Sequence, residues 1–373
     1  MTLITNGEMM LPNSLLYFMP IFVLVSGTAV AAPRISSVDF LSDSGEIRVS
    51  GDGFGRGPEV VIFDNFESGR DGEPVVYEAA TVGQWGGTGW FNGVAKYVDE
   101  GNGNLAMTAR DRSQSLSSMN RIAQLEARFE DSEKVFIAFS VKVPSGSTFA
   151  GASSAQSFPS VSSWKFTWAL AADGAYGDPS DLDLTLPTHV GGGNFILGGN
   201  DGNITWLDGG SGWWSWNGFN NLSIGIDLSM SNEVGYYWRS VSDRKFHWEE
   251  SSSDRNDLSA DKLLLNRVNF PGWWGNGDNS DFNGLYDNTY VAIGDNYLAR
   301  VEIRNGKDEA DTSKLIVVPA KSWSSSEIVL DSNIVEDLDD AYISIVDASG
   351  STSETFPISC TKCPSKVQSL EVE

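Results

Sequence analysis

The residues best suited to acid–base chemistry lie on three successive segments in which polar side chains recur at every second position. The segments 223–229, 234–240 and 245–249 are expected to form a meander of strands with one buried side. Alternation is then expected to gather five polar residues on the outer face, namely Asp227, Tyr237, Arg239, His247 and Glu249. They offer a general base, a general acid and a cation. Because any half-buried sheet has a polar face, an ordinary solvated surface is the alternative interpretation.

Tryptophan is concentrated in a few glycine-rich segments. Of thirteen tryptophans, four lie within residues 206–216, and others lie in the segments 84–93 and 271–284. An indole ring presents a flat apolar face with one N–H donor, and soluble proteins rarely expose several together unless they bind something. Packing under long loops is the alternative. We expect a carbohydrate-binding surface, with the candidate ligand-binding residues Trp206, Trp213, Trp214, Trp216, Trp273 and Trp274.

Length and charge limit the class of protein. The 373 residues suffice for two domains, and 50 acidic against 25 basic residues give a net charge of −25. Such a field repels nucleic acid and anionic membrane surfaces, so neither is expected as a partner. Glycine is abundant and long amphipathic helical patterns are scarce, which predicts an all-β chain.

The N-terminal segment is typical of an export signal. Residues 15–25 form an apolar run of signal-peptide length, and small residues precede a cleavage point near Ala31 or Ala32. The first ten residues carry no lysine or arginine, which is unusual for such a signal. A buried segment or an uncleaved anchor is the alternative. We expect residues 1–32 to be a signal peptide, and the mature protein to be extracellular, secreted or at the cell surface, without membrane insertion.

Residues 33–63 carry the pattern of one known family. Pro33 opens a strand, residues 46–50 form another, the run 51–55 reads GDGFG, and a third strand spans 59–63. This pattern resembles the opening of a TIG (IPT) domain, an immunoglobulin-like β-sandwich. The glycines would permit positive φ, and Phe54 would plug the sandwich. Because the closing strands of such a domain resemble residues 315–359, the resemblance implies one discontinuous sandwich of 33–63 plus 294–359.

The 230 residues between those parts, 64–293, are similar to a concanavalin A-like jelly roll. Two period-two patterns support strands with one buried side: Val135, Ile137, Phe139, Val141 and Val143, and then Leu222, Ile224, Ile226, Leu228 and Met230. The resemblance implies that the first and last strands of the insert lie side by side. The predicted fold is therefore a concanavalin A-like jelly-roll sandwich inserted into an immunoglobulin-like (TIG) β-sandwich, with residues 360–373 as a flexible tail.

Catalytic signatures of jelly-roll enzymes match poorly. Retaining glucanases of this fold carry an E-x-D-x-x-E strand, which does not occur here. Alginate lyases of this fold carry R-x-E-x-R and Q-I-H strands. The run 124–128 (QLEAR) keeps only the Glu and the second Arg, Gln124 replaces the first Arg, and Q-I-H is missing. Candidate parts for a lyase are Arg121, Arg128, His189, Tyr237 and His247.

Metal and thiol chemistry have weaker signals. Acidic loops at 178–183 and 278–281, together with Asp64 and Asp287 at the predicted seam, suit one structural Ca²⁺. Cys360 and Cys363 form a lone C-x-x-C, for which a local disulfide is the simplest interpretation. The leading hypothesis is a secreted protein that binds a polysaccharide or surface glycan through loop tryptophans. The alternatives are a polysaccharide lyase or glycoside hydrolase, and a structural cell-surface or appendage component.

Overall fold

The computed structural model describes residues 31–358 with internal gaps. The gaps are residues 42, 102, 116, 144–163, 172–181, 186–194, 200–201, 209–214, 216–217, 230–232, 243–244, 255–263, 275–282, 309–311, 313 and 335–340. Residues 1–30 of the predicted signal peptide, the C-x-x-C pair Cys360 and Cys363, and most of the acidic loops therefore lie outside the described residues. The described part contains no helix with the length and apolar character needed to span a bilayer.

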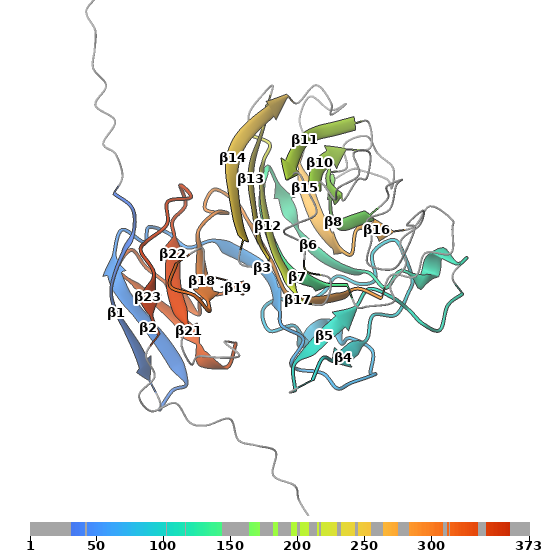
Figure 1. Cartoon of the computed structure of the whole chain (residues 1–373), viewed down its shortest axis with the longest axis horizontal. Coiled ribbons are helices and arrows are strands. Elements are labelled where there is room, and N and C mark those ends of the chain that lie inside the picture. The colour runs from blue at the N-terminus through green and yellow to red at the C-terminus, as the bar shows by residue number, and fades with distance from the viewer. Residues whose placement is uncertain are drawn as a thin grey trace, which may run out of the picture. The chain divides into compact units, whose positions relative to one another are not determined.

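The inserted region forms two antiparallel sheets (Figure 1). The eight-stranded sheet has the order β14-β13-β12-β7-β17-β5-β4, with β3 paired to β17. Its strands are β3 (Glu59–Asp64), β4 (Tyr97–Asp99), β5 (Leu105–Thr108), β7 (Lys134–Lys142), β12 (Asn220–Asp227), β13 (Glu233–Ser242), β14 (Lys245–Asp254) and β17 (Leu285–Ile293). The strand expected at 59–63 in the TIG-like part is instead β3 of this sheet, where it pairs with β17, the last strand of the predicted insert.

The seven-stranded sheet has the order β11-β10-β9-β8-β15-β6, with β16 paired to β8. Its strands are β6 (Leu125–Ser132), β8 (Trp164–Ala171), β9 (Leu182–Thr185), β10 (Phe195–Gly199), β11 (Gly202–Asp208), β15 (Leu265–Phe270) and β16 (Trp273–Trp274). The structure describes the backbone alone in β9, β10, β11 and β14, at positions 164, 171 and 274, and in β13 except at Arg239.

The two sheets enclose one apolar core, which follows from the period-two patterns in the sequence. Ile137 and Phe139 of β7 pack with Ile224 of β12, and all are fully or almost fully buried. Phe139 meets Phe270 of the opposite sheet with 5.6 Å between ring centroids. The buried Tyr286 hydroxyl donates a hydrogen bond to the Phe166 carbonyl at 2.9 Å, which satisfies its polar atom inside the core.

The remaining strands form two four-stranded sheets over a second core. One has the order β1-β2-β21-β20 and the other β19-β18-β22-β23. Because β2 pairs with β21, strands from both ends of the chain share one sheet. The bounds are β1 (Arg34–Leu41), β2 (Glu46–Asp52), β18 (Arg300–Arg304), β19 (Leu315–Val318), β20 (Ser322–Trp323), β21 (Glu327–Asp331), β22 (Tyr342–Val346) and β23 (Phe356–Pro357), with short 3-10 helices η1 (Tyr77–Ala79), η2 (Met119–Arg121) and η5 (Ser332–Ile334).

The GDGFG run behaves as its composition predicts. Gly53 and Gly55 have φ of 73° and 67°, which a residue with a side chain rarely adopts, and Phe54 is fully buried in the second core. The predicted all-β class, a jelly-roll sandwich together with a second sandwich, is confirmed by the sheets. Membership of the TIG family and the domain boundaries stay predictions.

The outer face of the eight-stranded sheet is covered by the second sandwich. Phe136 and Tyr290, which alternate with the core residues of their strands, share one buried cluster with Val301 and Ile316. Burial on both faces leaves β7 buried except at its two terminal lysines, and β17 buried along its whole length. A ligand therefore cannot lie over this part of the eight-stranded sheet.

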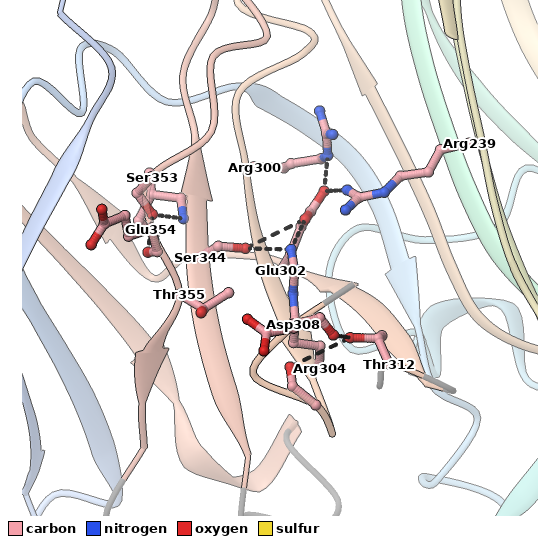
Figure 2. Close-up of polar contacts among 12 residues, drawn as sticks. Arg239, Arg300, Glu302, Arg304, Asp308, Thr312, Ser344, Ser353, Glu354 and Thr355 are labelled. Atoms are coloured by element: carbon pink, nitrogen blue, oxygen red, sulfur yellow. Dashed lines mark hydrogen bonds and ion pairs between the residues drawn. The ribbon is translucent and has the colours of Figure 1, made fainter. Parts of the chain in front are cut away.

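A buried charge cluster joins the two parts at the same face. Glu302 is fully buried and pairs with Arg239 of the jelly roll, with Arg300 Nε at 2.8 Å and with Arg304 Nη2 at 3.1 Å (Figure 2). Burial alone would raise the pKa of Glu302, but the three guanidinium groups outweigh it and lower the pKa to about 2. Arg239 therefore serves as an ion-pair partner inside the protein.

Candidate functional site

The prediction that the five acid–base candidates share one face of the sheet is wrong. In the paired register Tyr237 lies opposite Glu250 and Arg239 opposite Trp248, while His247 lies opposite Ser240 and Glu249 opposite Trp238. Since residues directly opposite share a face, positions 247 and 249 fall on the face opposite to that of positions 227, 237 and 239. The physical reason is register: a shift of one residue between β13 and β14 exchanges the faces of a whole strand, and alternation within each strand does not fix it.

Two of those five candidates have described side chains, and both make contacts within the protein. Arg239 pairs with buried Glu302, as above. Asp227 is half-buried, accepts hydrogen bonds from the Ser229 backbone at 2.9 Å and hydroxyl at 2.6 Å, and lies 3.7 Å from Lys134 Nζ. The strand register does not bring the five residues to one face, and a catalytic role for them stays a prediction.

The outer face of the seven-stranded sheet combines polar and aromatic positions instead. Across this sheet Glu126 pairs with Asn269, Asn269 with Trp168, Trp168 with position 183, and position 183 with Gly198. The neighbours Leu125 and Phe270 point into the space between the sheets, so this row lies on the other face of its sheet, where Glu126, Asn269 and Trp168 are nevertheless buried and Trp168 packs with the core cluster. A carboxylate, a carboxamide, an indole, an aspartate position and a glycine thus form one continuous row.

A second row on the same face contains two of the predicted ligand-binding tryptophans. Trp273 pairs with Lys165, Lys165 with position 185, position 185 with position 196, and position 196 with position 206. Lys165 Nζ lies 4.7 Å from the centroid of the Trp168 ring, which ties the two rows together. Trp273 and Trp206 therefore occupy opposite ends of one row, whereas position 274 alternates to the other face.

Cations and one carboxylate occupy the end of this face at β6 and β15. Arg128 pairs with Arg267 across the two strands, and Arg128 Nε forms an ion pair with the buried carboxylate of Glu126. The Arg128 side chain is 64% exposed, so its guanidinium remains accessible to a ligand. Arg267 lies 6.0 Å from the centroid of the Trp90 ring.

Trp90 and Asn269 are the two features of this face that a folded core does not require. Trp90 is 40% exposed and is among the few large apolar side chains on the described surface. Asn269 is fully buried, and among the described residues neither its Oδ1 nor its Nδ2 has a hydrogen-bond partner. A buried carboxamide without partners costs free energy, so its presence requires an explanation beyond folding.

The segment that carries Trp90 lies directly against the face. The Gly86 amide donates to the Glu126 carbonyl at 2.7 Å, and the Glu126 amide donates to the Gly87 carbonyl at 3.1 Å. A Cβ at position 89 would lie 2.2 Å from Gln124 Oε1 and 3.1 Å from Asn269 Nδ2. The glycines of this segment therefore permit a backbone approach that any larger residue would block.

The remaining tryptophan candidates have mixed outcomes. Trp213, Trp214 and Trp216 lie outside the described residues. Trp85, which the glycine-rich segment also carries, is buried in the core and donates from Nε1 to Asp64 Oδ2 at 2.8 Å. Trp273 is half-buried, with its Nε1 buried and without a partner among the described residues.

The predicted calcium ligands at the seam are engaged by protein donors. Asp64 Oδ1 accepts from the Phe66 amide at 2.9 Å, and its Oδ2 accepts from Trp85. Burial raises the pKa of Asp64 to about 6, although these two hydrogen bonds oppose the shift. Asp287 accepts from the Asn288 amide at 2.6 Å. The described ranges hold no group of three metal-ligating His, Cys, Asp or Glu residues, and calcium stays a prediction.

Comparison with known proteins gives structural likeness alone. No family model matches the chain, and no curated protein matches it in sequence. Alginate lyase Aly36B is similar at 12% identity over 64% of this chain and 97% of that one, with a TM-score of 0.39. Lectin II from Ulex europaeus is similar at 11% identity over 53% of this chain and 89% of that one, with a TM-score of 0.32. Values this low carry no activity over to this chain.

Sequence reasoning partly missed this site. The run 124–128 attracted attention as an incomplete lyase signature, but Asn269 and Arg267 carried no signal, because a half-buried strand commonly contains such residues. Plain alternation would put Lys165 and Trp168 on opposite faces of β8, and the register shift between Lys165 and Thr167 brings them to the same face, so the strand's pattern carried no signal for this face. The sequence of one strand cannot show that these polar and aromatic positions become neighbours across the strands of the sheet.

Proposed function

We propose that this chain is a secreted protein that binds a polysaccharide across the outer face of its seven-stranded sheet. One observation carries the proposal: a single face joins the exposed Trp90 and half-buried Trp273 with the cations Lys165, Arg128 and Arg267. Flat apolar rings with polar neighbours suit the apolar faces and hydroxyl rims of sugars. Export by the N-terminal segment is part of this proposal.

The spacing of the second row favours a polymer over a single sugar. Position 206 lies four strands from Trp273 along the paired row. At about 4.8 Å per strand this is a span of about 19 Å. A ligand that contacts both ends of the row must therefore be an oligomer.

The charges of this face favour an acidic polysaccharide. The chain as a whole carries a charge of −25, yet the described polar side chains with exposed area on this face include Arg128, Arg267 and Lys165. Of the acidic side chains described there, Glu126 is buried and paired with Arg128, and Glu130, two residues beyond Arg128 on β6, is exposed. Carboxylates spaced along a polymer would pair with such cations, in bidentate fashion with the arginines.

Binding to two matched polymers tests the proposal. Polygalacturonate and its fully methyl-esterified form share one backbone and differ in charge. We expect polygalacturonate to bind with a Kd at least about tenfold lower, and its binding to weaken with added salt. Equal binding of both polymers would refute the acidic preference, and no binding to these or to a broad neutral panel would leave a structural surface component.

Two variants with matched controls locate the binding face. Trp90→Ala should weaken binding of both polymers, whereas Val76→Ala, which shortens another exposed apolar side chain, should not. Arg267→Met should weaken binding of polygalacturonate alone. Its control is Arg48→Met, since Arg48 lies on the surface of β2 beside Glu327. Affinity unchanged in both face variants would place the binding site elsewhere.

Elimination by a polysaccharide lyase is the second candidate function. Arg128 and Arg267 could neutralise a uronate carboxylate while a base removes the neighbouring carbon-bound proton and the glycosidic C–O bond breaks to leave a double bond. Hydrolysis needs two carboxylates about 5–10 Å apart, and Glu126 lies three strands, about 14 Å, from position 183. Absorbance near 235 nm during incubation with polygalacturonate tests the lyase, and a flat trace would exclude this reaction on that polymer.

A further inference from the structure

Gln124 makes hydrogen bonds to two separate segments of the proposed binding face. Its Oε1 accepts from the Trp90 amide at 2.7 Å, and its Nε2 donates to the carbonyls of Pro271 at 2.9 Å and Gly272 at 2.7 Å. The residue is fully buried at the entrance to β6, on the face of Glu126. One carboxamide therefore holds the backbone beside Trp90 and the backbone beside Trp273.

We infer that Gln124 is a positioning residue that sets the separation of Trp90 and Trp273 for the glycan, an inference that rests on the proposed function. The two tryptophans are 183 positions apart in the sequence, counted from residue 90 to residue 273. Gln124 contacts the amide of Trp90 itself and the carbonyl that directly precedes Trp273. A small shift at Gln124 is therefore passed to both rings.

The chemistry of the amide explains why this position takes glutamine. The site needs one acceptor and two donors on a side chain of this length, and glutamine supplies both from one planar group. Glutamate of the same shape would place a negative charge against two carbonyl oxygens, and methionine would remove the hydrogen bonds that Gln124 makes to three backbone groups. Gly89 closes the site from the other side, because a Cβ there would lie 2.2 Å from Gln124 Oε1.

The test compares Gln124 with a buried carboxamide remote from the face. Asn221 also bridges two segments: its Nδ2 donates to Ser140 Oγ at 2.6 Å and its Oδ1 accepts from the Leu315 amide at 3.2 Å. Gln124→Met and Asn221→Leu should both lower the Tm. Only Gln124→Met should weaken polygalacturonate binding, by about tenfold, with Asn221→Leu within about twofold of the wild type.

A double-mutant cycle distinguishes a positioning role of Gln124 from a purely structural one. In a Trp90→Ala background, the effect of Gln124→Met on Kd should shrink to about threefold or less, since one of the two rings it positions is gone. Additive effects, or wild-type affinity in a folded Gln124→Met protein, would overturn the inference. Should Gln124→Met fail to fold, Gly89→Ala perturbs the same contact from the opposite side and should weaken binding similarly.

Hydrogen exchange separates this inference from the proposed function. The Trp90 amide of the wild type should be protected and should lose protection in the Gln124 variant, whether or not a glycan is bound. If the wild type binds no polygalacturonate, the proposed function fails on that polymer. If it binds and the Gln124 variant binds equally well with Trp90 amide protection lost, the positioning role alone is refuted.

Discussion

Removal of the Glu302 carboxylate should be among the most damaging single changes in the protein. Glu302→Gln keeps the shape of the side chain but leaves Arg239, Arg300 and Arg304 buried together without their shared negative charge. Loss of one partner from a buried ion pair costs about 3–5 kcal/mol. We expect the free energy of unfolding to fall by that amount at pH 7, measured by denaturation in urea.

The pH dependence of the wild type gives a second estimate from the same group. The pKa of Glu302 falls from 4.5 in the unfolded chain to about 2 in the fold. A lowered folded-state pKa stabilises the fold above the unfolded pKa, and the stabilisation disappears as the pH falls from about 4.5 toward 2. The shift corresponds to about 3 kcal/mol. The Glu302→Gln protein should lack this part of the acid slope.

An exposed ion pair supplies the control. Arg48 and Glu327 lie 3.5 Å apart with both side chains nearly half exposed, so Glu327→Gln should cost less than about 1 kcal/mol. Equal, small losses for Glu302→Gln and Glu327→Gln would refute the reasoning. So would an unchanged acid slope in Glu302→Gln, because the slope would then belong to other carboxyl groups.

Two further predictions concern Asp64 and two glycines at positive φ. Burial raises the folded-state pKa of Asp64 from 3.8 to about 6, so its contribution to stability is complete below pH 3.8 and falls by about 3 kcal/mol as the pH rises through 6. The Tm measured from pH 4 to 8 should therefore show a loss that Asp64→Asn reduces. An identical Tm profile in both proteins would contradict this. Gly83 has a φ of 74°, and a Cβ there would lie 2.1 Å from the Val61 carbonyl oxygen, so Gly83→Ala should lower the free energy of unfolding by about 2 kcal/mol or more. Gly72 is also at positive φ but has open space around it, so Gly72→Ala should cost less. Denaturation in urea measures both changes.

Within-strand patterns predicted the layers of this protein well. The alternation in 135–143 and 222–228 places the residues that the core contains, because a side-chain period of two is a property of the strand itself. The same rule puts Trp273 and position 274 on opposite faces of their strand. It fails for His247 and Glu249, since the register of β14 on β13 depends on the hairpin that joins them and not on either strand.

Long-range contacts explain the rest of what sequence reasoning missed. Arg239 was expected to be an exposed cation, but its partner Glu302 lies 63 positions away on a strand of the other sandwich. Gln124 was noted for the arginine it replaces, whereas its hydrogen bonds reach residues 147 and 148 positions further along the chain. Neither partner can be identified from local spacing, because the topology of the sheets decides which segments meet.

The pairing of β2 with β21 has a consequence for how the molecule is made. When β2 emerges during synthesis, its partner has not yet been translated, and the entire jelly roll must follow before that sheet can close. A chain truncated after residue 293 would leave β1 and β2 with an unpaired edge and would expose the apolar side chains of Phe136 and Tyr290 to water. Expression of the jelly roll alone should therefore yield aggregates, and a soluble form of it should need the final strands.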